Sequence, residues 1–275
     1  MQAMQATRIG LLGAGNMAGA LLAGLLASRI VDPKQLRASD SRPARLAELS
    51  ASHGIETHAS NLDLVRWANV VVLSVKPGVV PSVLAECGSS IGADHLVISI
   101  VAGVPISTIE ARLGSGARVV RAMPNTPALA QAGATALSAG RTTTPSDLEI
   151  ARAVFDAVGK TVVLEEALLD AVTGLSGSGP GYVMLLVEAL ADGGVKAGLP
   201  RDVAQLLATQ TVYGSAKLLL DTREHPARLK DMVTSPGGTT IAGLSVLEAH
   251  AVRGAFIEAV DRASQRSAEL GKKSS

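Results

Sequence analysis

The sequence has few aromatic residues, one cysteine and almost no net charge, and each shortage excludes a class of protein. Aromatic side chains make up 2% of the 275 residues, which argues against sites that bind nucleic acids or sugars by ring stacking. The net charge is +1, and the basic residues are scattered rather than gathered in the patch that nucleic acids require. A lone Cys87 excludes an intrachain disulfide framework and a metal cluster built from cysteines.

Long apolar runs and metal-binding patterns are also missing. No apolar run reaches the roughly 18 residues of a membrane span, and residues 1–8 lack the apolar core of a signal peptide. We therefore expect a cytoplasmic protein with no membrane or nucleic-acid partner. No metal is expected either, because no HxxH or HxxxH spacing occurs among the histidines, which are His53, His58, His95, His225 and His250.

Hydrophobic residues make up 47% of the chain, which predicts a folded protein with a core of Ala, Val, Leu and Ile. The first half alternates short apolar runs with helical patterns, typical of a parallel sheet with helices on both faces. The run 69–75 is apolar through its middle and is expected at the centre of that sheet. The strands are expected at residues 8–13, 36–40, 69–75, 95–101 and 117–123, with helices at residues 17–28, 43–53, 79–87 and 106–113.

From Ser146 onward the sequence predicts only helices. Ser146 as the N-cap and Glu149 three residues later form a capping box, and Gly159 is the expected residue just after that helix. The chain is thus predicted to divide into an α/β domain, residues 1–160, and an all-α domain, residues 161–275, meeting at a helix junction. Later helices are expected at residues 180–197, 200–221 with Pro200 at the first position, 241–250 and 254–270, followed by a frayed tail at residues 271–275.

A dinucleotide-binding turn is the sharpest local motif. It follows the first predicted strand and opens the first predicted helix, which is the context of a Rossmann-type fold. The first glycine permits a tight turn, the second lets the backbone approach a pyrophosphate, and the final alanine allows helix and strand to pack closely. The phosphates would meet the helix N-terminus. The motif consists of Gly13, Ala14, Gly15, Asn16, Met17 and Ala18.

The end of the second predicted strand gives conflicting signals about the cofactor. Asp40 lies where an acid accepts hydrogen bonds from the adenosine ribose, which favours NAD. Ser41 and Arg42 follow, and an arginine there pairs with a 2′-phosphate, which favours NADP. A third interpretation is that Asp40 is only a turn residue before Pro43.

Two further strand ends are candidate cofactor contacts. Ser74, Val75, Lys76 and Pro77 follow the central strand, at the edge where open α/β sheets bind ligands. Lys76 is either a ligand of the cofactor or an ordinary solvated charge. Asn125, within the segment MPNTP, either faces the nicotinamide or belongs only to a rigid turn.

Two glycine-rich segments interrupt the helical half. Glycine is costly there because it loses more backbone entropy than other residues, so a functional reason is expected. Residues 176–181 are one such segment, and the other consists of Ser235, Pro236, Gly237, Gly238, Thr239 and Thr240. In the second, backbone N–H groups and two hydroxyls gather at a helix N-terminus, which suits an anion such as a carboxylate. The alternative is that both segments are plain turns, with Thr240 as an N-cap.

Taken together, these motifs resemble the pyrroline-5-carboxylate reductase family over about residues 8–270. The most specific segment is LKDMVTSPGGTTIAGL at residues 229–244, and AVTGLSGSGP at 171–180 and DGGVKAGLP at 192–200 are equally characteristic. The resemblance implies a Rossmann-type domain followed by an all-α dimerisation domain, with the active site between them. It also implies reduction of the cyclic imine 1-pyrroline-5-carboxylate to L-proline, the last step of proline biosynthesis, by NADPH.

The resemblance also implies roles for individual residues. Asn61, Val75, Lys76 and Ala102 would line the cofactor site beyond the glycine-rich turn. The loop formed by Ser235, Gly237, Gly238, Thr239 and Thr240 would bind the substrate carboxylate, and Thr240 would hydrogen-bond the ring nitrogen. Glu166 matches an acid that lies near the substrate.

Two positions depart from the family pattern. Met232 stands where an amide commonly helps to hold the cofactor, and Asp40 stands where a small hydroxyl residue can bind the 2′-phosphate. NADPH remains the expected cofactor, with NADH as a second possibility. Two other functions stay open: a related hydroxyacid dehydrogenase or imine reductase, with Lys196 or Lys217 as proton relay, and a non-catalytic cofactor-binding protein.

The helical half also predicts a homodimer. Residues 182–196 and 200–221 are apolar over most of the helix circumference, and such helices must be buried on every side. A single copy of the domain offers too few partners for this, so we expect a second copy of the chain to cover them. Some members of the family assemble dimers into a larger ring.

Overall fold

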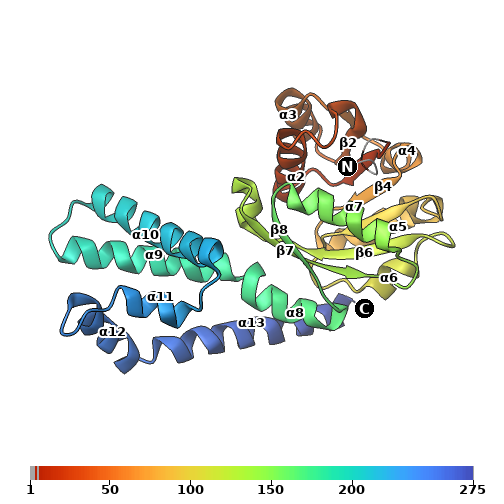
Figure 1. The fold of residues 1–275 in the computed structure, drawn as a ribbon. Helices are drawn as coiled ribbons and strands as arrows, with labels where there is room; N and C mark the ends of the chain where they lie inside the picture. Colours follow the sequence, from red (N-terminus) through yellow and green to blue (C-terminus); the bar gives the residue numbers. More distant parts are fainter. Residues whose placement is uncertain (1–3, 5, 275) are drawn as a thin grey trace. The chain divides into compact units, whose positions relative to one another are not determined.

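Figure 1 shows the computed structural model, which describes residue 4 and residues 6–274. The chain forms two compact units, one made of residues 1–178 and 262–275 and the other of residues 179–261. The first unit contains the sheet, and the second is helical. Within the described residues, no helix is long and apolar enough to cross a membrane. The predicted boundary at residue 160, between a dinucleotide-binding domain and an all-α domain, stays a prediction.

The described part of the first unit holds an eight-stranded sheet with the order β3-β2-β1-β4-β5-β6-β7-β8. Every neighbouring pair is parallel except β6 and β7. The predicted central strand is confirmed, because β4 pairs with β1 and β5 and is buried along its whole length. The strands are β1 Ile9–Leu12, β2 Leu36–Ser39, β3 Glu56–His58, β4 Val70–Leu73, β5 Leu96–Ser99, β6 Arg118–Met123, β7 Gly133–Ala139 and β8 Gly159–Val163.

Helices cover both faces of this sheet, as Figure 1 shows and as the sequence predicted. Apolar side chains of α2, α3 and α7 form one buried cluster with the sheet. Those of α4, α5 and α6 form a second cluster on the other face. The α/β fold class is confirmed. The helices are α2 Asn16–Ala27, α3 Pro43–His53, α4 Asn61–Trp67, α5 Val80–Cys87, α6 Ile106–Glu110, α7 Pro145–Asp156 and the short α8 Leu169–Val172.

The predicted start and end of α7 are wrong. Its N-cap is Thr144, whose hydroxyl accepts the N–H of Asp147, and Asp147 completes the capping box in place of Ser146 and Glu149. Pro145 fixes this start, since proline is favoured in the first turn and would be costly further inside. Gly159 begins strand β8 rather than following a helix end, so residue 160 lies in a strand and not at a helix junction.

The second unit is built from α-helices, as predicted. These are α9 Gly179–Lys196, α10 Arg201–Thr222, α11 Pro226–Met232, α12 Thr239–Ala249 and the first part of α13 Val252–Ser274. Helix α11 was not predicted, and Pro200 is the N-cap of α10 rather than its first residue.

Two details near the ends of α9 and α13 differ from the prediction. Residues 176–181 do not break the helical half, because Thr173–Gly177 form a π-helical turn that leads directly into α9. Helix α13 continues through residue 274 instead of fraying at Gly271; Ser275 lies outside the described residues. Its last part belongs to the first unit, where Ser267 donates to Asp170 and the backbone of Gly271 lies against Gly103.

Candidate active site

The glycine-rich turn joins β1 to α2 at the carboxyl edge of the parallel strands. Gly13 has φ +97°, a conformation that side chains rarely adopt, and a Cβ there would lie 2.7 Å from the carbonyl oxygen of Ser74. Its N–H donates to the carbonyl of Ser39 over 2.8 Å. Only glycine therefore allows the turn to pass so close to the end of β4.

The N-terminus of α2 is available to an anion. Gly15 is the N-cap, no side chain caps the helix, and a Cβ at Gly15 would meet open space. The first N–H groups of a helix have no partner within the helix and carry its positive dipole end. Ala18 is fully buried, which agrees with close packing of α2 on the sheet. This arrangement suits a pyrophosphate.

Asp40 occupies the end of β2 beside this turn. One carboxylate oxygen accepts the N–H of Ala14 over 2.9 Å, and the guanidinium of Arg42 contacts both oxygens at 2.8 and 3.0 Å. The hydrogen bond from Arg42 is the main reason that the pKa of Asp40 falls to about 2, and partial burial opposes that shift. Asp40 is thus a fixed anion that organises the turn, and its partner Arg42 is largely exposed.

The polar side chains around the turn mostly support the backbone. The Ser74 hydroxyl lies 2.7 Å from the carbonyl oxygen of Gly13. Asn61 accepts from the hydroxyl of Ser39 and donates to Glu86, both over 2.7 Å. Lys76, Pro77 and Ala102 are exposed where β4 and β5 end, Val75 is half-buried, and the exposed Ser41 separates Asp40 from Arg42.

Asn125 uses both polar atoms of its side chain within the first unit. Its Oδ1 accepts the N–H of Ala134 in β7 over 2.8 Å, and its Nδ2 donates to the carbonyl of Ser176 over 3.0 Å. This geometry favours the interpretation that Asn125 braces a rigid turn.

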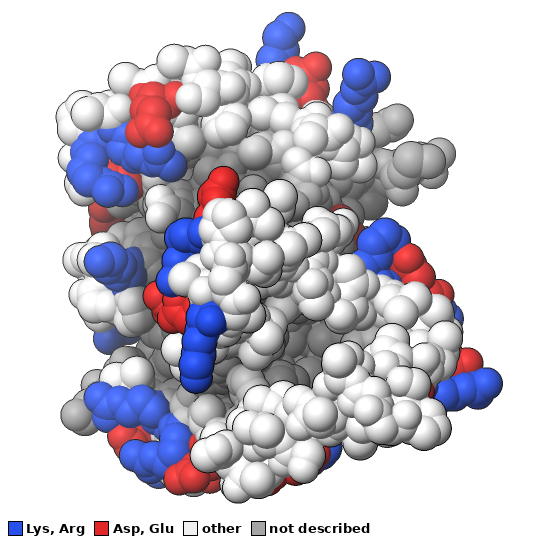
Figure 2. Space-filling view, turned by 90° about the vertical axis from the view of Figure 1, so that its left-hand side faces the viewer, with Lys and Arg blue, Asp and Glu red and all other residues white. Residues whose placement is uncertain are grey.

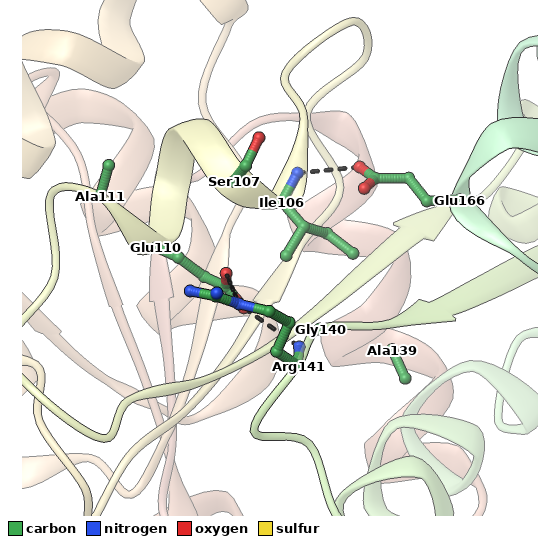
Figure 3. Close-up of a pocket in the computed structure, with 8 residues that line it drawn as sticks. All are labelled: Ile106, Ser107, Glu110, Ala111, Ala139, Gly140, Arg141 and Glu166. Carbon is green, nitrogen blue, oxygen red and sulfur yellow. Dashed lines mark hydrogen bonds and ion pairs between the residues drawn. The ribbon is translucent and has the colours of Figure 1, made fainter.

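Glu166 lies away from the glycine-rich turn, at the rim of a pocket of about 500 Å³ between α6 and the end of β7. Figure 3 shows its carboxylate beside the start of α6, where Oε1 accepts the N–H of Ile106 over 2.8 Å. The same oxygen lies 3.0 Å from Nη1 of Arg121. Glu110 and Arg141 form an ion pair at the opposite wall.

The predicted anion-binding loop lies in the second unit. Gly237 has φ +68°, and the N–H of Gly238 donates to the carbonyl of Ser235 to close a turn. Helix α12 begins at Thr239 with Gly238 as its N-cap and no capping side chain. Thr240 is therefore the second residue of the helix, and the alternative in which it acts as the N-cap is wrong.

Thus the first unit brings the glycine-rich turn, Asp40 and Ser74 together, whereas residues 235–240 belong to the second unit.

Met232 is 73% exposed. Lys217, a candidate proton relay, is paired with Asp221. Arg121 was not among the residues predicted from the sequence, although an arginine inside the apolar strand VVRAM is a visible signal.

Sequence comparisons identify both halves of the chain. A family described as pyrroline-5-carboxylate reductase dimerisation matches residues 166–270, and one described as NADP oxidoreductase, coenzyme F420-dependent, matches residues 8–103.

Whole-length relatives agree with these matches. A pyrroline-5-carboxylate reductase of Methanosarcina acetivorans is 48% identical over 98% of this chain and 100% of its own length. The structure of one from Coxiella burnetii has a TM-score of 0.88 and 37% identity, covering 96% of this chain and 98% of that one. A pyrroline carboxylate reductase of Plasmodium falciparum, solved with NADP bound, has a TM-score of 0.86 and 30% identity, covering 98% and 99% of the two chains. The chain belongs to the pyrroline-5-carboxylate reductase family.

Proposed function

We propose that this protein reduces 1-pyrroline-5-carboxylate to L-proline with a reduced nicotinamide dinucleotide. The observation that carries the proposal is 48% identity to a pyrroline-5-carboxylate reductase over the whole length of that relative. The glycine-rich turn and the uncapped start of α2 are the local features that this activity needs.

The cofactor fits the residues at the carboxyl edge of the sheet. The turn from Gly13 to Ala18 would hold the pyrophosphate against the start of α2. Asp40, Ser41 and Arg42 would face the adenosine ribose, and residues 74–77, Asn61 and Ala102 would line the rest. When bound, the cofactor supplies the hydride. We propose NADPH, which the NADP bound in the structure of the Plasmodium falciparum relative supports. NADH is the alternative that Asp40 favours.

Positioning supplies most of the catalytic effect in this proposal. A cyclic imine protonates readily, so the substrate arrives as an iminium ion and no strong protein acid is needed. The N–H groups of the loop at residues 235–240 would bind its carboxylate, and the Thr240 hydroxyl would meet the ring nitrogen. Holding the reacting groups at near-attack distance removes several kcal/mol of the barrier.

We also propose a homodimer in the cytoplasm, built through the helical unit that matches the dimerisation family.

An absorbance assay at the nicotinamide band tests the activity. The purified protein is mixed with NADPH or NADH, and pyrroline-5-carboxylate is then added. We expect oxidation of the cofactor only after the imine is added. No turnover with either cofactor would overturn the proposal.

A further inference from the structure

Arg45 lies on the first turn of α3, and its side chain reaches the glycine-rich turn. A cation is unfavourable at that position, because a helix N-terminus carries the positive end of the dipole and this first turn holds no acidic residue. The side chain of Arg45 is nevertheless only 22% exposed. Its Nη1 pairs with Glu48 of the same helix at 2.6 Å, and its Nε donates to the carbonyl of Ala14 over 2.8 Å. The bond to Ala14 is the contact that α3 itself does not explain.

Helix α2 leaves room for this guanidinium. Helices α2 and α3 pack on the same face of the sheet (Figure 1). A Cβ at Gly19 of α2 would lie 3.2 Å from Nη2 of Arg45, which is closer than side chains normally pack. With Nη1 on Glu48 and Nη2 against Gly19, the Nε group is the part of the guanidinium directed at the turn.

The two polar backbone groups of Ala14 are both held by side chains. Ala14 is fully buried, its N–H donates to Asp40 over 2.9 Å, and its carbonyl accepts from Arg45. The carbonyl of Ala14 and the N–H of Gly15 belong to one planar trans peptide, so they point in opposite directions. Holding the carbonyl therefore also fixes the direction of the Gly15 N–H.

That N–H group is free to bind a ligand. Among the residues that the structure describes, the N–H of Gly15 has no hydrogen-bond acceptor, and a Cβ at Gly15 would meet open space. Gly15 is also the N-cap of α2, where a pyrophosphate fits. The bond from Arg45 thus acts on the opposite end of a peptide that faces the expected phosphates.

We infer that Arg45 is a positioning residue for the dinucleotide, which fixes the Ala14–Gly15 peptide so that the Gly15 N–H is directed at the pyrophosphate. The inference rests on the proposed function, in which this turn holds the cofactor. A donor that is ordered before binding avoids the cost of ordering it during binding. NADPH and NADH carry the same pyrophosphate, so Arg45 supports both equally, in contrast to Asp40 and Arg42 beside the ribose.

Arg45→Met and Arg45→Gln form a matched pair that tests the bond. Glutamine places an amide nitrogen at the position of Nε and can still donate to Ala14, whereas methionine places a methyl group there. We expect the Kd for NADPH, measured by calorimetry without the imine, to rise roughly tenfold in Arg45→Met, the effect of losing one hydrogen bond. The Kd for NADH should rise by the same factor. Arg45→Gln should bind both cofactors nearly as tightly as the wild type.

Three results in these titrations would overturn the inference. Wild-type affinity of Arg45→Met would show that the bond is not needed. Equal weakening in Arg45→Met and Arg45→Gln would assign the effect to the charge. A change in the ratio of the NADPH and NADH affinities would place Arg45 at the 2′-phosphate instead of the turn.

Glu48→Gln is the control for helix α3. It removes the ion pair of Arg45 and leaves the bond to Ala14, so the Kd for NADPH should stay at the wild-type value. Weakening equal to that of Arg45→Met would show that the ion pair within α3 matters rather than the turn. An unfolded Arg45→Met beside a folded Arg45→Gln, judged by circular dichroism, would make the bond essential to the fold, and would likewise overturn the inference.

Kinetics separates positioning of the cofactor from a role in the reaction. In Arg45→Met, kcat at saturating NADPH and the KM for pyrroline-5-carboxylate should equal the wild-type values, because Arg45 acts only on the binding of the dinucleotide. A lower kcat at saturation would contradict this. If the wild-type protein binds neither dinucleotide, the proposed function itself fails. If it binds them and Arg45→Met binds them equally well, only the inference about Arg45 fails.

Discussion

Asp40 combines two tasks at a single residue. It accepts the N–H of Ala14 in the glycine-rich turn, and it holds the guanidinium of Arg42 beside the expected ribose site. Because Arg42 lowers the pKa of Asp40 to about 2, the carboxylate is ionised throughout the neutral range. A fixed negative charge there opposes a 2′-phosphate and leaves Arg42 already engaged.

We therefore predict that Asp40→Ser increases the preference for NADPH over NADH. The substitution removes the opposing charge and frees Arg42 for the 2′-phosphate. The measurement is the ratio of kcat/KM values for the two cofactors. Asp63→Ser, which removes an exposed acid from α4, controls for net charge and should leave the ratio as it is. An unchanged ratio in Asp40→Ser would show that this carboxylate does not face the ribose.

Cys87 lies in an environment that lowers the reactivity of its thiol. It is fully buried in α5, and burial, assisted by the charge of Glu86, raises its pKa to about 11. Alkylation needs the thiolate, so at pH 8 we predict a reaction with iodoacetamide roughly a hundredfold slower than for an ordinary cysteine. Mass spectrometry of native and urea-unfolded protein measures this. Equally fast labelling of both samples would contradict the prediction.

At the scale of elements, the start of α12 carries the proposed substrate contact. Thr240 is half-buried on the first turn of that helix. If its hydroxyl meets the ring nitrogen, Thr240→Val should retain the fold and lower kcat/KM about a hundredfold, as when one positioned donor is lost.

Steady-state kinetics and circular dichroism check the Thr240→Val prediction. Thr209→Val removes a hydroxyl that bonds only within α10, and it should keep full activity. Near-normal activity of Thr240→Val would reject the proposed role of the hydroxyl. Loss of folding would contradict the expectation that this substitution at the start of α12 retains the fold.

The elements that the sequence predicted are those with strong local patterns. Strands β1, β2, β4, β5 and β6 read as apolar runs, and α3 was predicted with its observed bounds. Strand β7, GATALSA, is built from small residues of low strand preference and forms only by pairing with β6 and β8. Strand β8 is a half-exposed edge strand, and only its pairing with β7 reveals it.

The candidate site was also only partly predictable from the sequence. The glycine-rich turn was predictable because its phosphate-binding geometry is contained in six consecutive residues. The contact between Arg121 and Glu166 joins β6 to the segment after β8, and no local pattern specifies such a pair. The positive φ of Gly237 was equally hidden, although the clustering of glycines pointed to the loop.

At the scale of the whole molecule, the helical unit exposes more apolar surface than its own core can bury. Its buried cluster consists of Ala191, Ala204 and Ala208. Figure 2 shows large areas of the helical end without Lys, Arg, Asp or Glu. Exposed apolar patches of this kind mark sites of association. The most exposed side chains include Met184, Leu185, Leu206, Leu220 and Ile257, each at least 66% accessible.

We predict an obligate dimer that buries these residues. Light scattering at low micromolar concentration should give about twice the 27.9 kDa of one chain, or a multiple of that value. Leu206→Glu should weaken assembly, because it places a charge on the apolar face of α10. Arg228→Glu, which also changes an exposed residue of the helical unit, is the control and should leave the mass unaffected. A stable, active monomer would contradict the prediction.

Helix α13 begins in the helical unit and ends in the first unit, where Ser267 bonds Asp170. The helical unit is thus inserted into the sequence of the first unit, which is made of two separate segments of the chain. This order of segments affects how the protein is synthesised. During translation the sheet emerges first, yet the helical turns that finish its unit are made only after residue 261. Until then Asp170 and Gly103 lack their covering segment. A nascent chain therefore holds an incomplete first unit while the apolar helices emerge, which is the period of greatest exposure to aggregation.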